Sequence, residues 1–322
     1  MAIDWTKVTK VFKGYEEVEK IYAGYEDVYD DEPSPSIDYT IPFWVENTSG
    51  QEGEMTCSWA GGSIDPEYST DGINWSAANY VFPLAVPAGG KVYMRSEAYN
   101  ATTTNYTVFT IGMNVTHKAG GNILSLCDKT NYATLTEAPG KCLGAVFSGD
   151  TNLTDASEIN FGHITTTGNN LCRQMFSGCT SLVNVPDLSK FTVISQYGMG
   201  YMFSNCTSLV TPPNLSSVRS VTTSGLMKMF SGCTSLTSGA NITGITTSSS
   251  GMRQMYLNCS SLTVAYAPNL STWNTANTQN WLSGVAASGT LYCPSERMYN
   301  SIPANSVAGC PAGWTKAQMT SE

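Results

Sequence analysis

One eight-residue segment occurs four times in this chain, and its spacing limits the folds that the chain can adopt. The copies occupy residues 175–182, 202–209, 229–236 and 255–262, and the first reads Met-Phe-Ser-Gly-Cys-Thr-Ser-Leu. Their cysteines follow one another at steps of 27, 27 and 26 residues. A fixed period of this size is typical of arrays in which each repeat buries its apolar side by stacking on its neighbours. Such arrays usually offer an extended binding surface.

Two altered copies flank the four. Residues 146–153 carry Asp150 in the place of the cysteine, and residues 281–285 carry Val285 there. Because terminal repeats lack one neighbour and drift in composition, we expect about six units in one continuous solenoid between Gly120 and Gly289.

Each repeat divides into two halves. Apolar residues of the segment 171–176 fall at i, i+1, i+4 and i+5, which predicts a short helix. The second half runs from a leucine such as Leu182 past a proline to a second apolar residue such as Leu188, which predicts a short strand. Helix plus strand at this repeat length predicts an α/β leucine-rich-repeat solenoid over residues 119–289. Its predicted core consists of Phe147, Phe176, Phe203, Phe230, Tyr256, Cys179, Cys206, Cys233 and Cys259.

The pattern Met-x-x-Met-Phe-x-x-Cys-x-Ser-Leu resembles the BspA-like leucine-rich repeats of bacterial surface proteins and of phage or prophage proteins from gut bacteria. The resemblance covers about half of the chain. Residues 66–75 and 88–95 look like the β-domain that often precedes such repeats, and residues 289–294 and 311–315 look like their usual C-terminal end. The chain differs from cell-surface members because we find neither an export signal nor a wall anchor. This difference weakens the bacterial-surface interpretation, and the architecture around the repeats resembles that of phage structural proteins.

Ten cysteines raise the question of metal sites and disulfides. The chain has no Cys-x-x-Cys and only two histidines, so we expect neither a metal site nor a cofactor. The four cysteines of the repeats should form a ladder of free thiols, since a reducing cytoplasm disfavours disulfides, although neighbouring rungs could come within bonding distance. Cys293 and Cys310 are the candidate pair for a true bridge, and the sequence leaves this open.

Three further segments complete the predicted organisation. Short apolar runs separated by Asp71-Gly72 and Gly89-Gly90 predict a small all-β, sandwich-like domain over residues 37–118. Residues 290–322 would form a C-terminal cap. Residues 1–36 contain a ten-residue repeat and an acidic, proline-rich linker, and are either a flexible leader or a docking and oligomerisation segment. Its docking residues would be Tyr15, Tyr22, Tyr25 and Tyr29.

Charge limits the possible partners. The formal net charge is -9, and residues 171–290 hold one acid, Asp187, against five bases, which argues against nucleic-acid binding. Arg173, Lys228 and Arg253 recur near one repeat position and form either a weak positive line or an ordinary solvated face. No apolar run is long enough to insert into a membrane as a helix.

Catalysis has little support in the sequence. His117 and His163 lack a neighbouring Gly-x-Ser-x-Gly, and no glycine-rich phosphate loop occurs. The carboxylates Asp150, Asp155 and Glu158 suit a solubilised terminal repeat better than glycoside cleavage. We therefore expect no catalytic residues and no enzyme.

The layout favours a bacteriophage virion protein, a head or tail fibre made in the host bacterial cytoplasm. Its N-terminus would attach to capsid or tail proteins, with homotrimeric assembly, and its repeats would adhere to host-surface glycan or protein. The alternative is a bacterial cell-surface BspA-like adhesin, and a polysaccharide depolymerase comes third.

Overall fold

The computed structural model describes residues 12–13, 16–17, 37–59, 65–78, 81–97, 109–137, 140–247, 250–270 and 273–319. The chain divides into two compact units, Met1–Asp38 and Tyr39–Glu322. In the first unit, β1 (Phe12–Lys13) and β2 (Glu16–Glu17) pair with each other in antiparallel orientation. The four tyrosines of the predicted docking segment lie outside the described residues.

Two sheets form the N-terminal part of the second unit. One contains β4 (Gly53–Trp59), β7 (Leu84–Val86) and β9 (Phe109–Met113) in the antiparallel order β7-β4-β9. The other has the order β11-β10-β3-β8-β5-β6. Its strands are β3 (Trp44–Asn47), β5 (Glu67–Ser69), β6 (Ser76–Ala77), β8 (Lys91–Arg95), β10 (His117–Asn122) and β11 (Leu153–Asn160). Alternate residues of β8 and β9 are buried, as expected for strands with one side on a core.

The β-domain continues directly into the first repeat. β11 belongs to that repeat and pairs in parallel with β10, which also pairs antiparallel with β3. The ring of Phe43 in the β-domain meets that of Phe147 edge to face at 5.8 Å, within one shared hydrophobic core. β10, which contains the expected boundary at residue 118, therefore pairs with a strand of the β-domain on one side and with a strand of the first repeat on the other.

Turns, rather than helices, build the first half of each repeat. The Met175 N–H donates to the Cys172 carbonyl at 3.2 Å within the repeat, whereas the Phe176 N–H donates to the Met202 carbonyl at 2.9 Å in the next one. This alternation continues along the segment and recurs in the following repeats. An α-helix would satisfy these groups internally. Here alternate N–H groups of the turn segment depend on the neighbouring repeat for their acceptors.

Left-handed backbone recurs at every fourth residue of these turns. In one repeat, Asn170, Gln174 and Gly178 have φ values of 59°, 59° and 78°. The next two repeats have positive φ at Tyr197, Tyr201, Asn205, Ser224, Lys228 and Gly232. A right-handed helix needs φ near −63° throughout, so it cannot include these positions.

The predicted α/β leucine-rich-repeat solenoid is therefore wrong. The helices of the described residues are the 3₁₀ turn η3 (Ile123–Leu126) and α1 (Glu296–Ser301), and both lie outside the four repeat copies. Apolar residues at i, i+1, i+4 and i+5 fit a four-residue succession of turns as well as a helix, which is why the pattern misled. No helix of the described chain is long and apolar enough to span a membrane.

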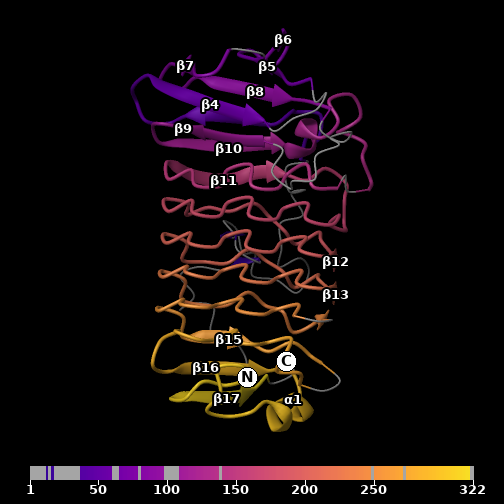
Figure 1. The fold of residues 1–322 in the computed structure, drawn as a ribbon, viewed down its shortest axis with the longest axis vertical. Coiled ribbons are helices and arrows are strands. Elements are labelled where there is room, and N and C mark those ends of the chain that lie inside the picture. Colours follow the sequence, from indigo (N-terminus) through magenta and orange to yellow (C-terminus); the bar gives the residue numbers. More distant parts are fainter. Residues whose placement is uncertain are drawn as a thin grey trace, which may run out of the picture. The chain divides into compact units, whose positions relative to one another are not determined.

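Short parallel strands complete the repeats. They form two small sheets, β12-β13-β14 and β15-β16-β17. In Figure 1 the repeats lie one beneath another in chain order from β11 down to β17. The strands are β12 (Val193–Ile194), β13 (Ser220–Val221), β14 (Thr246–Thr247), β15 (Val264–Tyr266), β16 (Gly289–Cys293) and β17 (Trp314–Gln318).

Candidate functional site

A column of aromatic rings sets the spacing of the repeats. Neighbouring rings from Phe147 to Tyr256 have centroids 5.4 to 5.8 Å apart and planes within 6° of parallel, and all are fully buried. Trp281 follows, tilted by 56° at 6.3 Å. Burial also raises the pKa of Tyr256, whose hydroxyl accepts a hydrogen bond from the Ala240 N–H at 3.0 Å. Because the column keeps successive repeats in register, side chains at equivalent surface positions lie in columns too. Its members are Phe147, Phe176, Phe203, Phe230 and Tyr256.

The cysteines of the repeats form a buried ladder beside the rings. Each thiol donates to the carbonyl of the phenylalanine in the preceding repeat, as from Cys206 Sγ to Phe176 O at 3.1 Å. The other three bonds measure 2.9 to 3.0 Å. Burial raises the pKa of every rung, to about 12 for Cys259. These thiols therefore stay protonated as hydrogen-bond donors and are poor nucleophiles. The rungs are Cys179, Cys206, Cys233 and Cys259, all of them free.

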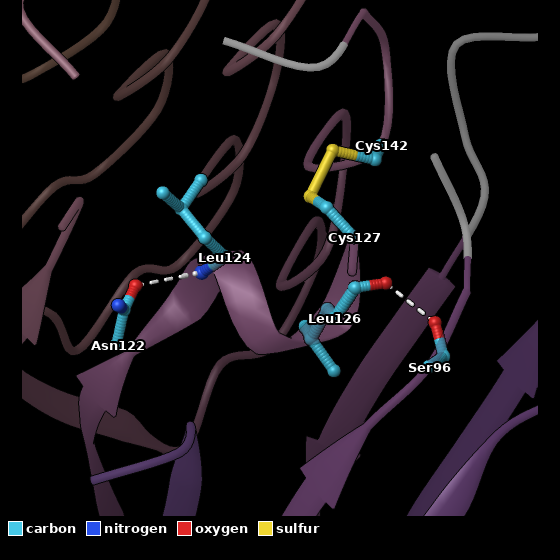
Figure 2. The surroundings of a disulfide bond; sticks show 6 residues. All are labelled: Ser96, Asn122, Leu124, Leu126, Cys127 and Cys142. Atoms are coloured by element: carbon cyan, nitrogen blue, oxygen red, sulfur yellow. Dashed lines mark hydrogen bonds between the residues drawn. A yellow bond between two sulfur atoms is a disulfide. The ribbon is translucent and has the colours of Figure 1, made fainter. Parts of the chain in front are cut away.

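The one disulfide of the described residues joins Cys127 to Cys142, with Cα atoms 5.6 Å apart. Figure 2 shows it at the C-terminal end of η3, and at the N-terminal end of that turn Asn122 accepts a hydrogen bond from the Leu124 N–H at 3.1 Å. Cys293 and Cys310, the candidate pair from the sequence, are both free. Sequence reasoning missed the true pair because connectivity among ten cysteines cannot be read from their spacing.

A buried pair joins the β-domain to the first repeat. Asp150 occupies the position that holds cysteine in the next four repeats, and its Oδ2 lies 2.9 Å from His117 Nε2 in β10. His117 Nδ1 contacts the Val115 carbonyl oxygen at 2.9 Å. The side chains of His117 and Asp150 are 0% and 4% exposed, so the pair links the β-domain to the first repeat inside the molecule and forms no surface site.

The other polar residues weighed from the sequence lie apart from this pair. His163 is exposed, with its ring 4.4 Å from that of Tyr39. Asp155 accepts a hydrogen bond from Asn184 at 2.9 Å, and Glu158 pairs with Lys118 at 3.0 Å. The structure therefore does not bring these residues together as one catalytic group. Within the described part of the chain, no cluster of three or more potential ligands could hold a metal ion.

The turns present a partly exposed band of planar and cationic side chains. Backbone hydrogen bonds connect neighbouring repeats within this band; for example, the Lys228 N–H donates to the Arg253 carbonyl at 3.0 Å. Elsewhere the exposed positions of the repeats carry mostly Ser, Thr and Asn. We call this surface the turn-face band and define it as Arg173, Gln174, Tyr197, Tyr201, Lys228 and Arg253.

Two cations of the turn-face band, Arg173 and Lys228, lie over its tyrosine rings. The guanidinium carbon of Arg173 is 4.5 Å from the Tyr197 centroid and 5.9 Å from that of Tyr201. Lys228 Nζ lies 5.4 Å from the Tyr201 centroid, so this ring is shared by two cations from different repeats. Such contacts orient the side chains while leaving their charge in place. Arg253 Nε is buried and has no hydrogen-bond partner among the described residues.

This arrangement suits recognition better than chemistry. Arginine and tyrosine are enriched where proteins bind partners, because they present rigid, amphipathic surface with hydrogen-bonding groups. The sequence indicated the three cations of the band. It missed Tyr197 and Tyr201, since these occur in one repeat and meet the cations only through stacking.

Comparison with known proteins reaches the repeats alone. Residues 143–242 and 170–288 match a family described as "Mycoplasma protein of unknown function, DUF285". No curated protein and no solved structure matches the chain. The two matched segments together span less than half of the chain and contain the whole turn-face band, and the match is consistent with a BspA-like protein.

Proposed function

We propose that this chain is a surface-displayed binding protein of BspA-like type, which catalyses no reaction. Through the turn-face band it attaches the particle or cell that displays it, here called its carrier, to another surface. The observation that carries the proposal is the sharing of Tyr201 by Arg173 and Lys228. Three repeats thereby contribute to one oriented, charged and aromatic surface. The match of the repeats to DUF285 supports the same class of protein.

The carrier that we propose is a bacteriophage particle, with the chain as a head or tail fibre. The support is the order of the segments: a short N-terminal unit, a β-domain and then the repeats. In this proposal residues 1–36 attach to capsid or tail proteins and assemble the chain as a homotrimer.

A second carrier, the surface of a bacterium, is favoured by a specific observation. Disulfides form and persist in oxidising environments, and the structure contains the pair Cys127–Cys142. The family match also fits a cell-surface adhesin. Immunogold labelling of intact particles and of intact cells separates the two carriers.

The binding proposal is tested with labelled protein on whole bacterial cells. Binding of the wild type should be saturable, and the double variant Tyr201→Ala/Lys228→Ala should bind at least about tenfold more weakly, since it removes two central contacts. Arg219→Ala is the matched control, because Arg219 is an exposed cation of the repeats outside the band. Wild-type binding with an unchanged double variant would refute the band as the site. Release of reducing sugar ends from the cells would instead identify a depolymerase.

A further inference from the structure

We infer that the turn-face band recognises an acidic polysaccharide, a chain of sugars that carry carboxylates, lying along the stack of repeats. This inference rests on the proposed binding function and names its ligand class. Four properties of the band carry it: the sign of its charge, the chemistry of its side chains, the spacing of the repeats and the absence of a free backbone edge in its turns.

The sign of the charge selects an anionic ligand. The chain as a whole has a net charge of -9, yet residues 171–290 contain five bases and one acid. That acid, Asp187, accepts hydrogen bonds from the N–H and hydroxyl of Ser189, both at 2.8 Å. A local excess of positive charge on an otherwise acidic protein attracts anions to that part of the surface. An anionic ligand is repelled by the rest of the protein and is therefore directed to the band.

Carboxylates and sugar hydroxyls match the available groups. The side chain of Arg253 is partly exposed, and its planar guanidinium can donate two parallel hydrogen bonds to one carboxylate. The tyrosines of the band add hydroxyls that can both donate and accept, as sugar hydroxyls do. A neutral glycan could also accept hydrogen bonds from these cations, but it would not form the stronger charge-assisted bonds that a carboxylate forms.

The spacing of the repeats favours an extended ligand. Rings of successive repeats are 5.4 to 5.8 Å apart, about the length of one hexose in an extended chain. Arg173, Lys228 and Arg253 come from three different repeats, so a polysaccharide along the stack meets a cation every one or two sugars. Several weak contacts of this kind then add up along one ligand.

The backbone of the turns argues against a peptide strand as the ligand. Peptides usually extend a sheet by pairing with free N–H and carbonyl groups at an edge. In the segment 172–178 every N–H already donates, alternately within its repeat and to the next one. Recognition at the band therefore depends on side chains, which suits a sugar chain.

The test compares two polymers with the same backbone. Polygalacturonate presents a carboxylate on every sugar, whereas fully methyl-esterified polygalacturonate presents none. Biolayer interferometry with the full chain should show polygalacturonate binding at least about tenfold more tightly than the ester, because each charged hydrogen bond adds more than one tenfold step. The binding should weaken as salt is raised.

Variants assign the effect to the band. Lys228→Gln and Arg253→Gln should each weaken polygalacturonate binding about tenfold, while Arg219→Gln should leave it unchanged. These are partly exposed side chains, and circular dichroism melts check that the variants fold. Equal binding of the esterified polymer, or equal binding of poly-glutamate at matched charge, would overturn the acidic-polysaccharide class. If cells are still bound through the band while polygalacturonate is not, the ligand class is refuted and the proposed function stands.

Discussion

Replacement of Phe203 by alanine tests whether the ring column holds the repeats together. Phe203 is fully buried between Phe176 and Phe230, with centroid distances of 5.4 and 5.8 Å and nearly parallel planes. The neighbouring repeats are tied together at this level by backbone hydrogen bonds, such as that from the Phe203 N–H to the Met229 carbonyl at 2.9 Å. We therefore expect little collapse around the cavity.

The expected cost follows from two contributions. Truncation of a buried phenylalanine costs about 3–5 kcal/mol when the cavity stays open. Each aromatic contact adds about 0.5–1.5 kcal/mol beyond the buried area, and Phe203 has two. Because the range of 3–5 kcal/mol describes whole substitutions and already includes such contacts, the free energy of unfolding should fall by about 4–5 kcal/mol, the upper half of that range. Phe161→Ala is the matched control, since Phe161 is equally buried but has one ring neighbour, Phe191, edge to face at 5.3 Å.

Equilibrium urea unfolding, followed by tryptophan fluorescence and circular dichroism, measures both variants. Coincident transitions by the two probes would justify two-state free energies. Phe203→Ala should lose more stability than Phe161→Ala. A loss below about 1 kcal/mol, which is the average for any substitution, would refute the view that the stacked rings stabilise the array.

Three further results are expected. Burial raises the pKa of Cys259 from 9.0 to about 12, so the stabilisation from the protonated thiol is full below pH 9.0 and is lost as pH rises toward 12. In urea titrations at alkaline pH, Cys259→Ala should make the fall of the unfolding free energy with pH less steep, by up to about 1.4 kcal/mol per pH unit. An unchanged slope would contradict the burial effect. Replacing Cys127 and Cys142 by serine should lower the free energy of unfolding by about 3 kcal/mol, as for a 15-residue loop, and wild-type peptide mapping that finds both residues alkylated before reduction would disprove the bond. His117→Ala should cost about 3–5 kcal/mol because it leaves the Asp150 carboxyl buried without its partner, and adding Asp150→Cys should recover much of this; a double variant as unstable as the single one would show that the pair is not the cause.

The candidate site shows how far repeats can be read from a sequence. Equal spacing places Arg173 and Arg253 at one repeat position, and this much follows from counting residues. The same counting cannot relate Tyr197 to Arg173, because a contact between different positions of two repeats depends on how the turns orient side chains. The left-handed backbone at Tyr197 and Tyr201 sets that orientation.

The sequence also failed to predict the disulfide and the buried His117–Asp150 pair, for a different reason. Cys127, Cys142, His117 and Asp150 all lie where the β-domain meets the repeats. Contacts at such a junction join segments of unrelated pattern, so no periodicity predicts them. Asp150 in a cysteine position was a usable signal, since a charge placed there inside the molecule needs a partner.

By itself the sequence determined the repeat length, the residues that share one position and, through their apolar character, the rings and thiols that are buried. It did not determine the backbone conformation, because a four-residue apolar period lies close to the 3.6 residues of a helical turn. The tertiary structure made that choice. Alternate N–H groups donate to carbonyls of the next repeat, and these hydrogen bonds exist only once two repeats have stacked. Turns with left-handed residues such as Gln174 therefore replace the helix that an isolated segment would favour.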